Sequence, residues 1–212
     1  MLITSVVWGT TWIVSKIGVK EIPALQMTSI RQLIGGVIFL SFFLFYKKVP
    51  MPTLKQFRWL FFMAILMFVS ANGLSTWSLM FIPTGLSALI GASYPLCVVI
   101  IEKVFFKSKR MTALTFAGLF LGIVGIAIVF YENAFQHAVP GFLFGVFLST
   151  VAMLSWSVAT IFISRNKTDI NPYYGIGWQM LMGGSMLFII AQATQPVVPF
   201  MQISTTVWLV FG

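Results

Sequence analysis

The sequence is poor in charged and metal-binding side chains. Only 8% of its 212 residues are charged, and it contains four carboxylates, one histidine and one cysteine, Cys97. A single cysteine excludes a disulfide framework and a thiolate metal site. The sequence also lacks a Ser/His/Asp or Cys/His constellation and a G-x-x-x-x-G-K-[ST] loop that would cradle phosphates. We therefore expect no enzymatic activity, no catalytic residue, no metal and no cofactor.

Apolar sequence is abundant instead. Hydrophobic residues make up 59% of the chain and the mean hydropathy is +0.99. The charged fraction of 8% is far below the roughly 25% of a soluble domain. Backbone polar groups in hydrocarbon must be paired internally, so only helices or closed barrels span a bilayer, and continuous apolar runs without alternation favour helices. The predicted fold class is an all-α polytopic membrane helix bundle.

Seven apolar segments are long enough to cross a bilayer, for which about 20 residues are needed. They are residues 2–19, 24–46, 59–80, 84–106, 112–131, 141–164 and 173–194. An eighth segment begins near Ser204. We interpret the first segment as a span and not a signal peptide, because no basic region precedes it and no small-residue cleavage site follows it.

Basic residues lie in alternate loops of this prediction. Nine lysine and arginine residues fall in the loops after the second, fourth and sixth segments. An excess of positive charge marks cytoplasmic loops. We therefore predict a multi-pass protein of the inner (plasma) membrane with its N-terminus in the cytoplasm. The same bias explains the net charge of +9 better than a nucleic-acid partner does.

A faint duplication runs through the chain at an offset of 148 residues. The matching pairs are Trp8 and Trp156, Ile22 and Ile170, Leu33 and Leu181, Gly35 and Gly183, and Gly36 and Gly184. Chance matches of common apolar residues would not include tryptophan, so the chain resembles a repeated unit.

The two copies are expected to cross the membrane in opposite senses. Five spans separate Trp8 from Trp156, and an odd number reverses direction. Inverted-topology repeats are typical of secondary transporters, which bind substrate near the repeat interface. We predict a first five-helix repeat at 1–131 and the start of a second at 141–212. A complete second copy would reach about residue 279 by the same offset, so the chain is either a fragment or is completed by helices from elsewhere.

These features resemble the EamA family of the drug/metabolite transporter superfamily. The resemblance covers essentially the whole chain and is carried by W-G-x-x-W at residues 8–12, Lys16, Pro23, Arg31, Pro95, Gly118, Gly122 and Gly125. It implies ten helices in two inverted five-helix halves, cytoplasmic termini, and export of metabolites such as amino acids. Family members commonly carry a Glu-Arg pair after the fourth helix, where this chain has Lys109 and Arg110.

Two helix faces are candidates for a substrate cavity. Trp8 and Trp12 lie on one stripe of the first segment, and Trp156 and Thr160 lie on the corresponding face of the sixth. Stripes related by the duplication would meet at the pseudo-two-fold axis, where a cavity is expected. The alternative is that the tryptophans fill the helix packing and the hydroxyl bonds to its own helix.

Asn72 and Thr76 lie in the third segment, where the polar side chains of residues 70–78 surround the helix. Such a helix should have little contact with lipid. The Asn72 carboxamide can offer a donor and an acceptor to a zwitterionic ligand, or it can bond to another helix. We assign Asn72 and Thr76 to substrate binding.

Tyr94 and Pro95 lie near the middle of the fourth segment. Tyr94 shares a helix face with Ser87 and Gly91, and we assign it to substrate binding. Pro95 removes a backbone donor, so we expect a kink and a freed carbonyl near Gly91. This makes Pro95 a candidate hinge or gating residue.

Lys16 and Arg31 are cations within or near the spans, and we assign them structural or gating roles. An arginine at the centre of a span costs roughly 2.5 to 3.5 kcal/mol, so Arg31 must face protein or water. Either it holds an anionic group of the substrate, or it caps carbonyls and pairs with Glu21. We favour the structural role, since Gln179 replaces Arg31 in the second copy.

The predicted function is export of small metabolites, such as amino acids or amphipathic compounds, by alternating access. The expected partners are a small-molecule substrate and the lipid bilayer, with a homodimer left open. Two alternatives stand beside this prediction: a non-transporting membrane scaffold or accessory subunit, and a carrier of lipid-linked or phosphorylated sugars. The second alternative requires cations that face the cavity.

Overall fold

The computed structural model describes residues 15–106, part of 114–131, residues 140–199 apart from 167, and residues 202–203. This part of the chain is dominated by helices and contains no strand, which confirms the predicted all-α class. The elements are α2 (Ala24–Ser41), the π-helix η1 (Phe42–Tyr46), α3 (Leu54–Ala64), the π-helix η2 (Ile65–Gly73), α4 (Leu74–Ser78), α5 (Thr84–Ala92), α6 (Tyr94–Phe106), α8 (Phe142–Arg165) and α9 (Pro172–Thr194).

Five helical stretches of the described residues are long and apolar enough to cross a membrane. They are Ala24–Tyr46, Leu54–Ser78, Thr84–Phe106, Phe142–Arg165 and Pro172–Thr194. Most of the predicted first span lies outside the described residues, although 15–21 are helical. The predicted span at 112–131 is helical at its described positions.

The third span begins at Leu54, five residues before the apolar run from which it was predicted. The reason is a capping box: the Gln56 amide donates to Thr53 Oγ1, and Gln56 Oε1 accepts from the Thr53 amide at 2.8 Å. This reciprocal pair satisfies backbone donors that the first turn leaves free. The helix therefore starts in a polar and basic stretch.

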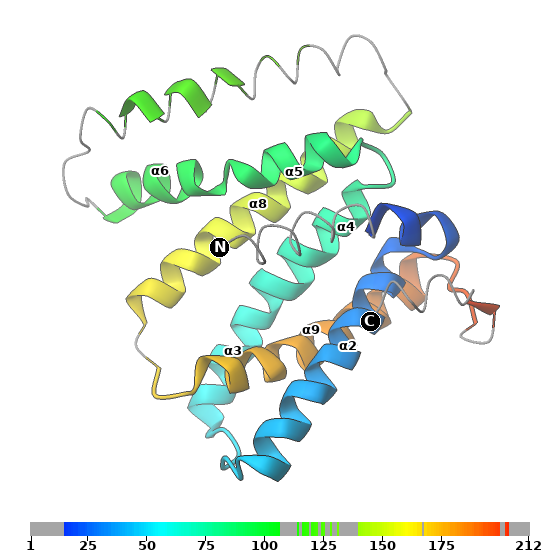
Figure 1. Ribbon diagram of the computed structural model, residues 1–212, viewed down its shortest axis with the longest axis vertical. Coiled ribbons are helices and arrows are strands. Elements are labelled where there is room, and N and C mark those ends of the chain that lie inside the picture. Colours follow the sequence, from blue (N-terminus) through cyan, green and yellow to red (C-terminus); the bar gives the residue numbers. More distant parts are fainter. Residues whose placement is uncertain are drawn as a thin grey trace.

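The helices form successive layers around α8 (Figure 1). On one side α8 contacts η2 and α4, and on the other side it contacts α5 and α6. Beyond η2 lie α2 and α9, which run side by side in the lower part of the figure. Thus α8 is the central helix of the described bundle.

Helices α2 and α9 are antiparallel and approach each other closely at their glycines. A Cβ at Gly36 would lie 2.8 Å from the backbone nitrogen of Leu181, and one at Gly184 would lie 3.1 Å from that of Leu33. Only residues without a Cβ permit this backbone approach, as in other membrane helix pairs.

Loops alternate between two ends of the bundle. Near one end the Leu25 amide donates to Gln195 Oε1, and near the other the Tyr174 hydroxyl donates to the Pro50 carbonyl. We call the first the outer end and the second the inner end, after the predicted orientation. The 79–83 turn belongs to the outer end, since the Lys16 ammonium near the end of the first helix binds its carbonyls.

Candidate functional site

The structure describes Trp156 and Thr160, whereas Trp8 and Trp12 lie outside the described residues. Trp156 and Thr160 are half-buried and lie one turn apart on α8. The Thr160 hydroxyl donates to the Trp156 carbonyl at 2.9 Å. This is the helix-internal bond of the alternative interpretation, and the hydroxyl oxygen can still accept a hydrogen bond.

Asn72 lies inside the π-helix η2. Its Nδ2 donates to the Met67 carbonyl at 2.7 Å, so this donor is used within its own helix. π-Helical turns are frequent at functional sites, which keeps this segment a candidate. Thr76 is buried in α4, with 9% of its surface exposed. We expected the polar stretch at 70–78 to have little contact with lipid. In the structure, every residue from 71 to 79 is buried or half-buried.

The fourth span is broken, as the proline predicts. Helix α5 ends at Ala92 and α6 begins at Tyr94, with Ser93 forming a turn between them. Pro95 has no N–H for the Gly91 carbonyl. At this break α8 approaches closely, because the Ser157 hydroxyl lies 3.3 Å from the Tyr94 carbonyl and also donates to its own helix.

A chain of serine hydroxyls joins three helices near the outer end. Ser87 Oγ of α5 lies 3.2 Å from Ser78 Oγ of α4 and 3.2 Å from Ser149 Oγ of α8. The three residues are at most 3% exposed. The Ser78 hydroxyl also bonds to the Ser75 carbonyl at 2.6 Å. The sequence shows each serine, but only the packing of α4, α5 and α8 reveals the chain.

The two candidate gating cations are both bound within the protein. The Lys16 ammonium donates to the Leu79 carbonyl and, at 3.2 Å, to the Ile82 carbonyl. A cation is favourable here because carbonyls at a helix C-terminus lack helical donors. Arg31 Nη1 donates to Ser15 Oγ at 3.1 Å. Both cations therefore tie the first helix to its neighbours.

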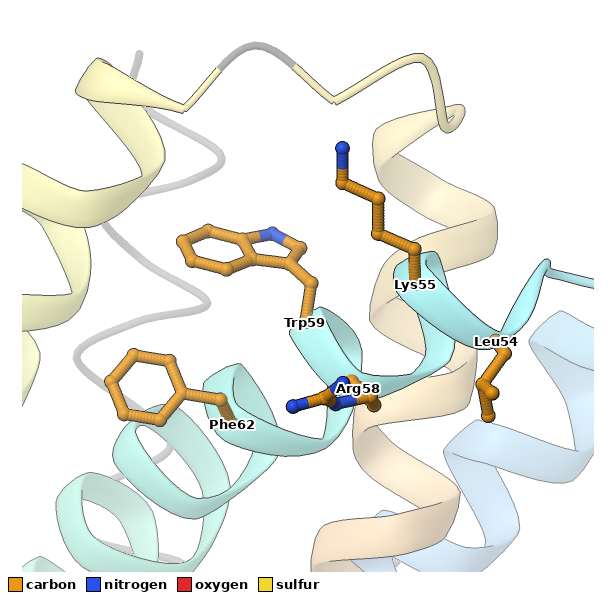
Figure 2. A pocket seen from close by; sticks show the side chains of 5 residues that line it. All are labelled: Leu54, Lys55, Arg58, Trp59 and Phe62. Carbon is orange, nitrogen blue, oxygen red and sulfur yellow. The ribbon is translucent and has the colours of Figure 1, made fainter.

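A groove at the inner end was not found from the sequence. It has a volume of about 640 Å³ and is lined by Leu54, Lys55, Arg58, Trp59 and Phe62 of α3 (Figure 2). The Trp59 and Phe62 rings project to the same side of the helix. Phe162 of α8 meets both, with ring centroids 6.4 Å from Trp59 and 5.4 Å from Phe62.

The groove has an unbalanced positive charge. No acidic residue lies in the first turn of α3, where the helix dipole is itself positive. Within the described residues, neither Lys55 nor Arg58 forms an ion pair. The sequence signal for this groove is the spacing of three and four residues between Lys55, Arg58, Trp59 and Phe62, which places all four side chains on one side of a helix.

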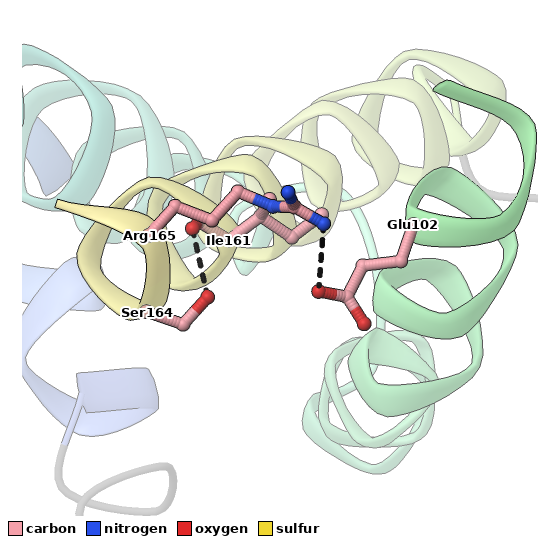
Figure 3. A network of polar contacts seen from close by, with 4 residues as sticks. All are labelled: Glu102, Ile161, Ser164 and Arg165. Carbon is pink, nitrogen blue, oxygen red and sulfur yellow. Dashed lines mark hydrogen bonds and ion pairs between the residues drawn. The ribbon is translucent and has the colours of Figure 1, made fainter. Parts of the chain in front are cut away.

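Another cation at the inner end is neutralised. Arg165 of α8 forms an ion pair with Glu102 of α6, with 3.6 Å between Nη2 and Oε1 (Figure 3). Its guanidinium also lies 3.8 Å from the centroid of the Phe106 ring. In the same view the Ser164 hydroxyl donates to the Ile161 carbonyl. Lys55 and Arg58 have no such acidic partner among the described residues and are available to an anionic ligand.

Known proteins resemble this chain in sequence and fold. The model of the EamA-like transporter family matches residues 1–131. Over 189 residues the chain is 29% identical to the uncharacterized transporter YoaV of Bacillus subtilis, covering 87% of this chain and 63% of the relative. Over 185 residues it is 26% identical to the uncharacterized inner membrane transporter YedA of Escherichia coli K12, covering 87% and 58%. The chain therefore spans about three fifths of the length of these relatives.

A crystal structure also shares the fold. It superposes with a TM-score of 0.65 at 18% sequence identity, and the match covers 95% of this chain and 70% of the other. At this identity the likeness concerns the arrangement of helices alone.

Proposed function

Because this chain belongs to the EamA-like transporter family, we propose that the complete protein exports small metabolites across the inner membrane by alternating access. The substrates we propose are amino acids or similar amphipathic compounds. The N-terminus lies in the cytoplasm in this proposal, which is supported by the cations gathered at the inner end, Lys47, Lys48, Lys55 and Arg58.

The observation that carries the proposal is the reciprocal packing of α2 and α9. The 148-residue offset places Leu33 in correspondence with Leu181, and Gly36 with Gly184. Gly36 packs on Leu181, and Gly184 packs on Leu33. A contact that is unchanged when its two partners exchange roles is the mark of a two-fold axis. This supports two inverted halves, at 1–131 and from 141 onward, and such halves are the usual basis of alternating access.

The proposed substrate path runs along α8, beside Trp156 and the break before Pro95. This region has a tryptophan, a half-buried tyrosine (Tyr94) and a helix without a continuous hydrogen-bond ladder. Aromatic side chains bind the apolar part of an amphipathic solute at low entropic cost. In this proposal Trp8 supplies the matching aromatic face from the first half.

Flux through proteoliposomes tests the proposal. The full-length protein should move at least one solute from a panel of radiolabelled amino acids, sugars and cationic dyes. Trp156→Ala should lower that flux by about tenfold, since loss of an aromatic contact is worth on the order of 1 kcal/mol or more. Phe105→Ala, at a 74% exposed position of α6, is the control and should keep normal flux. Absence of flux for the whole panel would contradict the proposal.

A second candidate function is transport of an anionic solute, such as a phosphorylated or lipid-linked sugar. It is favoured by Lys55 and Arg58 beside the Trp59 ring, which form no ion pair within the described part of the chain. Lys16 and Arg31 are poorer candidates, because carbonyls and a hydroxyl already bind them. Replacing Lys55 and Arg58 with glutamine should abolish transport of a sugar phosphate but spare that of a neutral amino acid. Equal loss of both would argue against a role in anion binding.

A further inference from the structure

The ends of α2 and α9 are joined by two contacts that the duplication makes equivalent. Gln26 is the third residue of α2 and binds Val198, in the segment after α9. Tyr174 is the third residue of α9 and binds Pro50, in the segment after α2. The 148-residue offset places Gln26 in correspondence with Tyr174, and Pro50 with Val198. The same contact is thus made twice, once at each end of the bundle.

The outer contact comprises three hydrogen bonds, two of which are made by the Gln26 side chain. Gln26 is completely buried; its Nε2 donates to the Val198 carbonyl at 2.6 Å, and its Oε1 accepts from the Val198 amide at 3.0 Å. The Leu25 amide, at the uncapped start of α2, donates to Gln195 Oε1 at 3.2 Å. Opening this end would leave the buried Gln26 amide without its partners, which is costly.

The inner contact has one hydrogen bond, to an exposed segment, beside a ring contact between Tyr174 and Phe43 with 5.8 Å between the centroids. The Tyr174 hydroxyl donates to the Pro50 carbonyl at 3.2 Å. The ring is buried, but Pro50 and the preceding Lys47 and Lys48 are exposed. When the bond breaks, water or lipid head groups can bind the Pro50 carbonyl, so little hydrogen bonding is lost. The start of α9 is capped independently by Asn171, whose Oδ1 accepts from the Tyr173 amide at 3.0 Å.

We propose that Gln26 and Tyr174 are positioning residues that form two unequal latches between α2 and α9, so that the inner end opens in the resting protein while the outer end stays closed. The outer latch comprises Leu25, Gln26, Gln195 and Val198, and the inner latch comprises Pro50 and Tyr174. This inference rests on the proposed function for its meaning, since a resting state open to the cytoplasm is the one in which an exporter loads its solute. The difference in strength between the two latches does not depend on whether the protein transports a solute.

Distances between spin labels at equivalent positions test the inequality. In the full-length protein, freed of other cysteines and placed in lipid nanodiscs, one pair of labels replaces Lys20 and Thr194 at the outer end. The pair related to it by the offset replaces Thr168 and Tyr46 at the inner end. All four positions are exposed. Without any solute, the outer pair should give one narrow distance distribution, and the inner pair should give a broader one with a second, longer component.

Latch variants then assign the effect to the named bonds. Gln26→Leu keeps the size of the side chain but removes the amide, and should raise the ratio of open to closed outer ends by about tenfold, the value of roughly one to two buried hydrogen bonds. Tyr174→Phe should lengthen only the inner distances. Gln192→Leu, at an exposed position near the same end, is the matched control and should leave both distributions unchanged.

Two results would overturn the inference: an outer pair as broad as the inner pair in the unmodified protein, or a Gln26→Leu variant with unchanged outer distances. Neither result depends on flux. A protein that transports nothing can still show unequal latches, which would contradict the proposed function alone. A protein that transports normally with equal ends would contradict the latches alone.

Discussion

The closest backbone approach between α2 and α9 gives a sharp test of the packing described above. In Gly36→Ala, the new Cβ would lie 2.8 Å from the Leu181 nitrogen and 3.2 Å from both the Leu181 Cα and the Gly177 carbonyl oxygen. Non-bonded heavy atoms prefer separations of about 3.5 to 4.0 Å, and these neighbours are backbone atoms that no rotamer change can move. The two helices must therefore separate by roughly 0.5 to 1 Å.

The energetic consequence can be estimated. Overpacking of this kind costs about 1 to 3 kcal/mol, and alanine returns up to about 1 kcal/mol through its higher helix propensity. We expect Gly36→Ala to lower the free energy of unfolding by about 1 to 2 kcal/mol, measured by unfolding in mixed detergent and SDS micelles. Gly85→Ala is the matched control, because a Cβ at Gly85 would meet no atom within 4 Å. It should be neutral or slightly stabilising.

The reciprocal position gives an intermediate expectation. A Cβ at Gly184 would lie 3.0 Å from Leu33 Cγ and 3.1 Å from its nitrogen, so Gly184→Ala should cost less than Gly36→Ala. The expected order of stability is Gly85→Ala, then Gly184→Ala, then Gly36→Ala. If Gly36→Ala proved as stable as Gly85→Ala, the close crossing of α2 and α9 would be refuted.

Two further predictions concern polar contacts near the outer end. Ser87→Ala removes the middle hydroxyl of the serine chain and should lower the free energy of unfolding by about 1 to 3 kcal/mol. Adding Ser149→Ala should cost less than the sum of the two single changes, since the two serines share one hydrogen bond. Fully additive values in the same SDS unfolding assay would contradict the chain. Lys16→Met takes the ammonium from the carbonyls of the 79–83 turn and should speed amide hydrogen exchange there, whereas Lys20→Met, at an exposed position, should not; equal exchange in both variants would show that Lys16 does not hold the turn.

Apolar length and backbone chemistry account for what could be predicted of the fold. The segments 24–46 and 84–106 coincide with helical stretches of the structure, because a run of about 20 apolar residues suits the hydrocarbon thickness wherever its helix lies. The break before Pro95 was predictable for an equally local reason, the missing N–H of proline. The early start at Leu54 was missed, since the Thr53 and Gln56 capping box lies outside the apolar run.

The candidate site was less predictable because its parts come together from distant positions. Thr160 looked available to a solute, yet it bonds to the Trp156 carbonyl, and a sequence cannot choose between these two partners of a hydroxyl. The Trp59 ring beside Lys55 and Arg58 packs on Phe162, more than a hundred residues away. Among the described residues assigned to the substrate, Asn72, Tyr94, Trp156 and Thr160 are half-buried and Thr76 is buried.

The amino-acid sequence alone determined that this chain is a helical membrane protein, since hydropathy is a property of residues in order, and it predicts that two parts of the chain are related by a 148-residue offset. The tertiary structure decided which contacts the residues related by this offset make. Gln26 and Tyr174 are related by the predicted offset, but Gln26 is a completely buried amide that bonds twice to the half-buried Val198 backbone, whereas Tyr174 bonds once, through its hydroxyl, to the exposed Pro50. Hydrogen-bond energy depends on partner and solvent exposure, and both are set only when the helices pack.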